Sequence, residues 1–359
     1  MSKQKSNPSP VRAEPSLEQW EALYEVANNL KKLAPWRALS DTDILVLQLP
    51  GQKEPVYCSI MGSGGMSYGI SVYPGHESFA RLRRIIEQDE HSRPELLMLE
   101  QDCLVCNFGD REEIESQDRA VMKELGLRFR GRGQWIYFRS MVPGQFPWFL
   151  DAEQAELLTS ALQNLAMLCL CYMEGKLKVD FDAGETLTRW FDSEKDSWMN
   201  AVIPLSIPKM DRDMTLQDEL LLARLKRGKK TDTRLEIDSF YLPIPIQEDK
   251  LSPPFGAHMA LLMDKDTGMV LGQEIVGPDT PDYTVAPSML VNYMTEYGRP
   301  AAVYVRSEWT GALLRNTCKT IGVRLVEDEG VPVIDEALDD LMGSFLGGFP
   351  GFPMMDDFA

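Results

Sequence analysis

The sequence predicts a protein of the α+β or mixed α/β class that is built from two domains. With 359 residues, the chain is long enough to bury two hydrophobic cores. Its 44% hydrophobic and 26% charged residues are typical of globular proteins. Short apolar runs of strand type alternate with amphipathic helical segments in both halves. These observations favour an N-terminal α+β domain followed by a C-terminal α/β domain.

The N-terminal half begins with an amphipathic helix. Leu17–Leu33 carries apolar residues at helical spacing, and Ser16 is a suitable N-cap. A long apolar helix, capped by Asp151, is expected over 151–173. Between these helices the sequence predicts strands at 44–49, 56–61, 68–73 and 101–108, helices at 76–90 and 111–125, and a β-prone segment at 127–141. We therefore predict an N-terminal α+β domain over residues 17–174.

The C-terminal half contains the clearest pattern. Two apolar runs, 257–264 and 269–276, flank the turn Lys-Asp-Thr-Gly and predict a hairpin. The other expected elements are strands at 235–246, 301–305 and 323–326 and helices at 286–297, 309–321 and 335–342. The resulting order is three strands, helix, strand, helix, strand, helix. It predicts an α/β domain over residues 231–342.

Three further segments complete the predicted domain organisation. Residues 175–230 are expected to connect the domains and to include a basic helix at 215–230. Residues 1–16 are polar and proline-rich, which predicts a disordered arm. Residues 343–359 combine glycine and proline with phenylalanine and methionine. This tail either frays or docks in an apolar groove of a partner.

Charge and composition restrict the partners of the chain. A net charge of −18 disfavours nucleic acid and anionic membranes, although a local basic patch can override the average. The most apolar stretch, 157–173, contains Gln163 and Asn164 and is short for a membrane span, so a buried helix is expected. Six cysteines without a secretory signal fit free thiols in a reducing compartment. The expected location is cytoplasmic, with no membrane association.

Two motifs suggest a ligand site but have simpler explanations. The loop Gly62–Gly65 resembles a phosphate-binding loop, but a β-type run follows where that loop needs a helix. A hairpin turn is the better interpretation. Cys103 and Cys106 have zinc-ligand spacing, and Cys169 with Cys171 could complete a site. Residues three apart on a strand face opposite sides, so the sequence favours buried thiols.

Basic residues are interleaved with aromatic residues in one stretch, 128–139. Arg128, Arg130, Arg132 and Arg139 surround Trp135 in a pattern that can stack bases and hold phosphates. A charged edge strand gives the same pattern. The basic run from 224 to 230 is likewise either a nucleic-acid contact or a solvated linker. Because of these two basic stretches, binding of nucleic acid is a third functional hypothesis.

The C-terminal half resembles the ribonuclease H-like fold of nucleases and integrase-type transposases. The resemblance rests on the element order and on two stretches, MDKDTGMVLG at 263–272 and GRPAAVYVRSE at 298–308. It implies a three-layer domain whose carboxylates hold two divalent metals, Mg or Mn. By position these carboxylates would be Asp238, Glu308 and Asp335, with Glu336 and Asp339 as alternatives to Asp335. The sequence departs from the pattern of these enzymes in two ways. They usually have an aspartate at the position of Glu308, and the first strand of this chain is interrupted by prolines.

The whole chain also resembles a bacterial family of uncharacterised two-domain proteins. The residues that carry this likeness include Val-Tyr-Cys-Ser-Ile-Met-Gly at 56–62, Val-Tyr-Pro-Gly at 72–75, Pro-Gly-Gln-Phe-Pro-Trp at 143–148 and Ile-Gly-Val-Arg-Leu-Val at 321–326. The resemblance implies no activity. The leading hypothesis is therefore a non-enzymatic interaction or regulatory module that binds an unknown protein partner and needs no cofactor. The alternative is a metal-dependent nuclease or nucleic-acid-processing enzyme.

Overall fold

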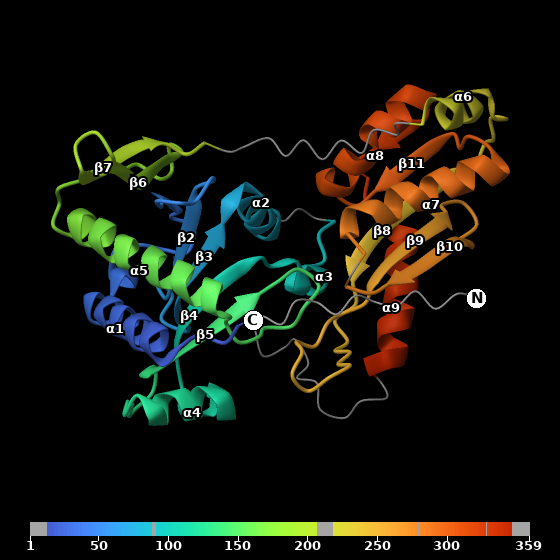
Figure 1. Ribbon diagram of the computed structural model, residues 1–359. Helices are drawn as coiled ribbons and strands as arrows, with labels where there is room; N and C mark the ends of the chain where they lie inside the picture. The colour runs from blue at the N-terminus through green and yellow to red at the C-terminus, as the bar shows by residue number, and fades with distance from the viewer. Residues whose placement is uncertain (1–12, 88–90, 207–217, 279, 328, 347–359) are drawn as a thin grey trace. The chain divides into compact units, whose positions relative to one another are not determined.

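The computed structural model describes residues 13–87, 91–206, 218–278, 280–327 and 329–346 (Figure 1). The chain folds as two compact units. Unit 1 contains residues 1–83 and 101–210, and unit 2 contains residues 84–100 and 211–359. Most of the predicted arm, 1–16, and of the predicted tail, 343–359, lies outside the described residues.

Unit 1 is organised around a seven-stranded sheet with the strand order β5-β4-β3-β2-β1-β6-β7. β1 and β6 are parallel, and the other neighbouring strands are antiparallel. The strands are β1 (Leu45–Gln48), β2 (Val56–Met61), β3 (Tyr68–Pro74), β4 (Cys103–Gly109), β5 (Trp135–Met141), β6 (Glu185–Asp192) and β7 (Ser197–Pro204). The helices are α1 (Leu17–Leu33), η1 (Pro35–Arg37), α2 (Gly75–Ile86), η3 (Arg111–Glu113), α4 (Ser116–Glu124) and α5 (Ala152–Met173), and α2 crosses into unit 2.

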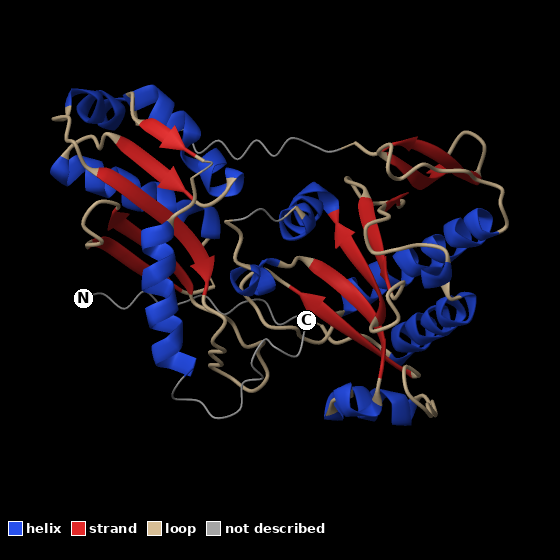
Figure 2. Cartoon of the chain, turned by 180° about the vertical axis from the view of Figure 1, so that it is seen from behind, coloured by secondary structure: helices blue, strands red, loops and turns tan. Residues whose placement is uncertain are grey.

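Alternating side chains give the sheet of unit 1 two buried faces. On β2, Cys58 and Ile60 belong to the large apolar cluster that α1 and α5 cover. Tyr57 points to the other face and stacks on Phe79 of α2. Figure 2 shows the long pair of helices along one side of this sheet. By length and composition α5 could cross a membrane, but in unit 1 it packs against α1 and the strands.

Several local predictions for unit 1 are confirmed. Ser16 caps α1 in a capping box, and Asp151 caps α5 in the same way. β2 and β3 form a hairpin, whose turn begins at Gly62 and includes Gly65, both at positive φ. A different result concerns the predicted connecting region, 175–230. It supplies β6 and β7 to the sheet, because β6 pairs in parallel with β1.

Unit 2 contains a five-stranded sheet with the order β10-β9-β8-β11-β12. β8, β11 and β12 are parallel to one another, and β9 is antiparallel to β8 and β10. The strands are β8 (Arg234–Tyr241), β9 (His258–Asp264), β10 (Val270–Val276), β11 (Ala302–Val305) and β12 (Arg324–Val326). The helices are α3 (Pro94–Leu97), η2 (Met98–Glu100), α6 (Glu219–Arg227), α7 (Asp282–Tyr297), α8 (Glu308–Ile321) and α9 (Pro332–Leu346). This is the element order expected for residues 231–342.

The two faces of this sheet carry separate apolar clusters, so unit 2 has three layers. Leu235 and Ile237 of β8 pack with residues of α6, α7 and α8. Phe240 of β8 packs on the opposite face, against Ile334 and Leu338 of α9. Figure 2 shows α9 crossing the strands on that face. Side chains of β8 with even numbers therefore point toward α9.

A segment from the N-terminal half is part of unit 2. Residues 84–100 begin in the last turn of α2, and the chain returns to unit 1 just before β4. Within unit 2, Leu96 of α3 joins the apolar cluster beneath α9. Arg84 forms an ion pair with Glu100 and lies over the ring of Trp309. The fold of unit 2 thus includes residues that the sequence assigned to the N-terminal domain.

Candidate functional site

Two of the three carboxylates proposed from the sequence lie together in unit 2. Asp238 is on β8, on the face covered by α9, and is 1% exposed. Asp335 is in the first turn of α9, and its side chain is 31% exposed. One arginine, Arg306, binds both. Its Nε donates to Asp238 Oδ2 at 2.6 Å, and its Nη1 donates to Asp335 Oδ1 at 2.8 Å.

The topology of the sheet places Arg306 beside Asp238. Val305 at the end of β11 pairs with Ile237 of β8, so the next residue along each strand faces α9. Arg306 is 6% exposed. Burial alone would lower the pKa of Arg306, but the charges and hydrogen bonds of Asp238 and Asp335 outweigh burial and raise it. The buried guanidinium therefore stays charged between its two carboxylates.

A second arginine extends this network from the inserted segment of unit 2. Arg93 donates from Nη1 to Asp335 Oδ1 at 3.3 Å and from Nη2 to Asp339 Oδ1 at 2.8 Å. Its Nε also bonds to Glu95. Arg306 Nη1 donates in addition to the carbonyl of His91, in the same segment. The network thus ties residues 91–95 to α9 and β8.

Glu308, the third proposed carboxylate, is not part of this network. It is exposed and opens α8, directly after the N-cap Ser307. Another buried acid on β8, Glu236, has a different role. Its Oε2 accepts hydrogen bonds from the backbone N–H groups of Val333 and Ile334, and its Oε1 accepts one from Lys265. Glu236 therefore stabilises the N-terminus of α9.

The geometry around Asp238 does not fit a pair of divalent metal ions. One oxygen of Asp238 accepts from Arg306, and the other accepts from the N–H of Ser239. A guanidinium lies between Asp238 and Asp335, where a metal ion would have to bind both. Within the described part of the chain, no group of three or more histidine, cysteine, aspartate or glutamate side chains is arranged to hold a metal ion. We therefore derive no metal-dependent step from these residues.

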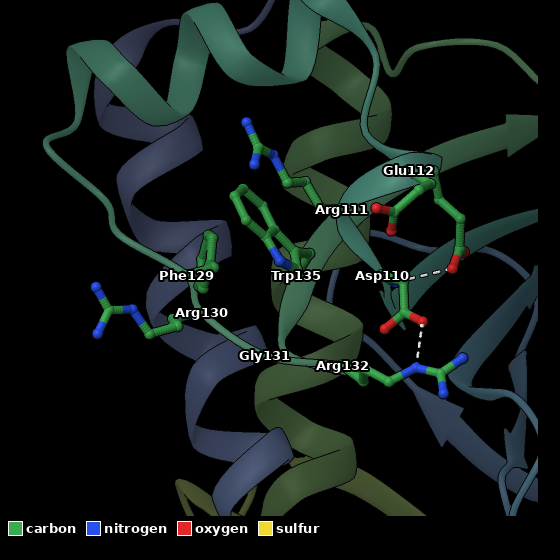
Figure 3. A pocket seen from close by; sticks show the side chains of 9 residues that line it. Asp110, Arg111, Glu112, Phe129, Arg130, Gly131, Arg132 and Trp135 are labelled. Atoms are coloured by element: carbon green, nitrogen blue, oxygen red, sulfur yellow. Dashed lines mark hydrogen bonds and ion pairs between the residues drawn. The ribbon is translucent and has the colours of Figure 1, made fainter.

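The basic and aromatic stretch of unit 1 lines an open cavity of about 840 Å³ (Figure 3). Phe129 and Trp135 are half-buried in it, with ring centroids 6.0 Å apart. In Figure 3 Arg111 lies beside the indole of Trp135, whereas Arg130 and Arg132 point to either side. The full lining is Asp110, Arg111, Glu112, Glu113, Phe129, Arg130, Gly131, Arg132 and Trp135.

Two acids of this cavity are engaged in internal bonds. Asp110 accepts from the N–H of Gly133 at 2.6 Å and from Arg132 at 3.3 Å. The Gly133 bond, supported by Arg132, lowers the pKa of Asp110. Glu113 accepts from the Tyr137 hydroxyl and from the N–H of Asp110. Arg111 and Arg130 are both exposed in the lining of the cavity.

The remaining sequence candidates are explained by the fold. Cys103 and Cys106 lie on opposite faces of β4, in two different apolar clusters. Arg139, at the end of the basic and aromatic stretch, is buried and binds Asp118 of α4. The basic run begins on α6, and after that helix the carbonyl of Lys229 accepts a hydrogen bond from the N–H of Arg299. It is therefore part of unit 2.

The sequence did not point to Arg306 or Arg93. The only available signal for Arg306 was its place directly after a short apolar strand, next to the strand that carries Asp238. That signal becomes meaningful only when the two strands are known to be neighbours. Arg93 gave no signal, since its partners Asp335 and Asp339 are more than two hundred residues away in the chain.

Comparison with known families gives one match in each half. Residues 20–189 match the family model described as a domain of unknown function (DUF7309), and residues 221–342 match one described as a domain of unknown function (DUF6930). The chain thus joins two domains of unknown function. This agrees with the two-domain organisation expected from the sequence. No curated protein matches the chain.

Proposed function

We propose that this protein is a non-enzymatic, cytoplasmic interaction module whose C-terminal unit is a ribonuclease H-like scaffold. The observation that carries the proposal is the position of Arg306, with its hydrogen bonds of 2.6 and 2.8 Å to Asp238 and Asp335. The resemblance to ribonuclease H-like enzymes implies that these two carboxylates bind metal. The guanidinium supplies a fixed positive charge there instead, and it stabilises the fold without activating water.

The cavity of unit 1 supports a role in binding. It offers two aromatic rings, Phe129 and Trp135, beside the cationic side chains Arg111 and Arg130. Aromatic residues and arginine are the residue types that contribute most to protein interfaces. The net charge of −18 repels a long polyanion, and the three arginines of the lining are balanced by three acids, Asp110, Glu112 and Glu113. We therefore propose a protein partner whose segment brings an aromatic side chain to Phe129 and Trp135.

The first test is a hydrolysis assay. The full chain is incubated with Mg²⁺ or Mn²⁺ and with single- and double-stranded DNA and RNA, and D335N serves as the matched control. We expect equal background hydrolysis from both proteins. Metal-dependent cleavage that D335N abolishes would replace the proposal with the nuclease alternative, with Asp238 and Asp335 as its metal ligands.

A second test asks whether Arg306 takes the place of a cation. R306S leaves Asp238 and Asp335 without their guanidinium, so added Mn²⁺ should raise the melting temperature of R306S but not that of the wild type. The double variant R306S/D238N lacks one carboxylate and should not respond. A Mn²⁺ response of the wild type as large as that of R306S would contradict the proposed role.

The nucleic-acid reading of the cavity has its own test. Binding of a single-stranded oligonucleotide is measured at low and at moderate salt, for the wild type and for R111A/R130A. Our proposal expects no binding that depends on these arginines. Affinity that falls steeply with salt and is lost in R111A/R130A would instead assign the cavity to nucleic acid.

A further inference from the structure

The sheet of unit 2 has an open edge at β10. This strand is the last one on its side of the sheet, and Figure 1 shows it outermost, beside β9. β10 is seven residues long, whereas β12 at the opposite edge has three residues. Its exposed residues are Val270, Gln273, Glu274 and Ile275. An edge strand of this length needs an explanation, because natural proteins usually shorten or cover an edge whose free backbone groups can pair with another chain.

The ladder between β9 and β10 shows which backbone groups of the edge strand face outward. The N–H of Asp264 in β9 donates to a carbonyl just before β10. Ladder bonds recur at every second residue of an antiparallel strand, so Ala260 and its partner Glu274 are also bonded to each other. Gln273 and Ile275, on either side of Glu274, therefore direct their N–H and carbonyl groups away from β9. Neither residue makes a backbone bond to another described segment.

Two aliphatic side chains of this edge lie uncovered on the face of the sheet that carries α9. Ile275 pairs with Met259, which packs in the apolar cluster beneath α9, so the side chain of Ile275 points to the same face. Val270 pairs with Met263 of the same cluster. Nevertheless, Ile275 is 59% exposed and Val270 is 49% exposed. α9 therefore covers the neighbouring strands and leaves the apolar side chains of the edge strand open.

Acidic side chains border this edge on both faces of the sheet. α9 turns Val333 toward the start of β10, since a Cβ added at Gly268 would lie 3.9 Å from Val333 Cγ1. Glu336 and Asp340 follow Val333 on the same side of α9, and both are exposed. On the other face of the sheet, Glu274 is exposed as well. A strand that binds at this edge therefore meets negative charge on either side.

We propose that the β10 edge binds an extended, basic segment of a partner protein, which adds a further strand to the five-stranded sheet of unit 2. The backbone groups of Gln273 and Ile275 supply the main-chain hydrogen bonds. Aliphatic residues of the segment pack beside Val270 and Ile275, and lysine or arginine at the alternate positions lies beside Glu274. This surface is separate from the cavity of unit 1 and does not depend on the function proposed for that cavity.

Charge favours a basic partner over a second copy of this chain. Two copies related by a twofold axis use both outward-facing residues when Gln273 of each pairs with Ile275 of the other. This register sets Glu274 opposite its own counterpart, and like charges directly opposite each other destabilise a sheet. Each copy also carries a net charge of −18, which opposes their approach. The same charge steers a basic segment toward the protein.

The first experiment measures the binding of synthetic peptides to the native full chain by fluorescence anisotropy. The probe is a peptide of about ten residues in which valine alternates with lysine, so that one face of the strand is aliphatic and the other is basic. A second peptide has the same composition, with the valines and lysines in separate blocks. We expect the alternating peptide to bind about tenfold more tightly than the block peptide, because only the alternating peptide matches both faces of the edge.

A proline at position 275 tests the open edge directly. I275P removes an N–H that points away from β9, so the sheet keeps its own ladder bonds and only the bound strand loses one. We expect I275P to weaken binding of the alternating peptide by about tenfold. Q273K/I275K places two lysines on the edge and should abolish binding, whereas Q52K/M66K adds the same charge at exposed positions of unit 1 and should retain it. Circular dichroism and the melting temperature check that each variant folds.

Either of two results overturns the proposal. Equal binding of the alternating peptide to the wild type, I275P and Q273K/I275K would mean that the peptide is attracted to the acidic surface in general and not to the β10 edge. Sedimentation velocity that finds a wild-type dimer and a monomeric I275P would mean that a second copy occupies the edge. Neither result affects the roles proposed for the Arg306 network and for the cavity of unit 1, which have separate assays.

Discussion

Arg306 in unit 2 and Arg189 in unit 1 are both buried arginines on one face of a sheet, but their partners differ. Arg306 binds two carboxylates, Asp238 and Asp335. Arg189 binds the side-chain amides of Asn164 and Asn200 and lies over the ring of Trp198. The charge of Arg306 is compensated by two acids, although its buried Nη2 makes no hydrogen bond to a described residue. The charge of Arg189 is held by neutral amide groups instead.

The role of a buried guanidinium depends on the groups that it binds. A guanidinium that satisfies two acids removes those acids from metal binding and gives them a structural task. A guanidinium bound only to neutral groups keeps a local positive potential, which stabilises any anion that forms beside it. Arg306 and Arg189 therefore differ in the groups that they bind and not in how deeply they are buried.

The largest expected effect comes from removing the compensated arginine. R306M leaves Asp238 buried without a cation, which should destabilise unit 2 by about 3–5 kcal/mol. Urea unfolding, followed by circular dichroism, measures the change. The double variant R306M/D238L replaces the pair with apolar groups and should recover most of the loss. If R306M were as stable as the wild type, the network would not be structural.

A smaller effect is expected at the arginine that has no carboxylate partner. N164D gives Arg189 a carboxylate oxygen where an amide oxygen now lies, 2.9 Å from Nε, but it removes the hydrogen bond from Asn164 Nδ2 to the Ser160 carbonyl. Because the second carboxylate oxygen then faces that carbonyl, we expect N164D to destabilise unit 1 by about 1 kcal/mol. The same unfolding assay, with N29D on the exposed side of α1 as control, tests it. Stabilisation by N164D would show that the new ion pair with Arg189 outweighs the lost bond to Ser160.

Local structure could be predicted from the sequence where short-range signals decide it. The helix over Leu17–Leu33 and its Ser16 cap, the hairpin at 257–276 and the order of elements in residues 231–342 all follow from periodicity, caps and turn residues. The opposite faces of Cys103 and Cys106 also follow, since a strand repeats every two residues.

Long-range pairings could not be predicted in this way. The parallel pairing of Leu45 with Leu187 joins strands separated by more than a hundred residues, and no local motif encodes it. The placement of residues 84–100 in unit 2 depends on Leu96 and Arg93, whose partners lie in the C-terminal half. Of the candidate site, the sequence located Asp238 and Asp335 but not the arginine between them, because that neighbour relation is set by the sheet.

The smallest expected effect concerns Asp110, at the exposed cavity of unit 1. Its pKa is lowered from the ordinary value of 3.8, mainly by the Gly133 N–H and then by Arg132. A carboxyl with a depressed folded-state pKa contributes stability above pH 3.8, and that contribution is lost as the pH falls through the folded-state value.

D110N cannot ionise, so the difference in stability between wild type and D110N should shrink as the pH falls below 3.8. Thermal melts across that range measure it. A constant difference would mean that Asp110 acts through its shape and not its charge. The hydrogen bond from the Gly133 N–H would then hold Asp110 in place whether or not its carboxyl is charged.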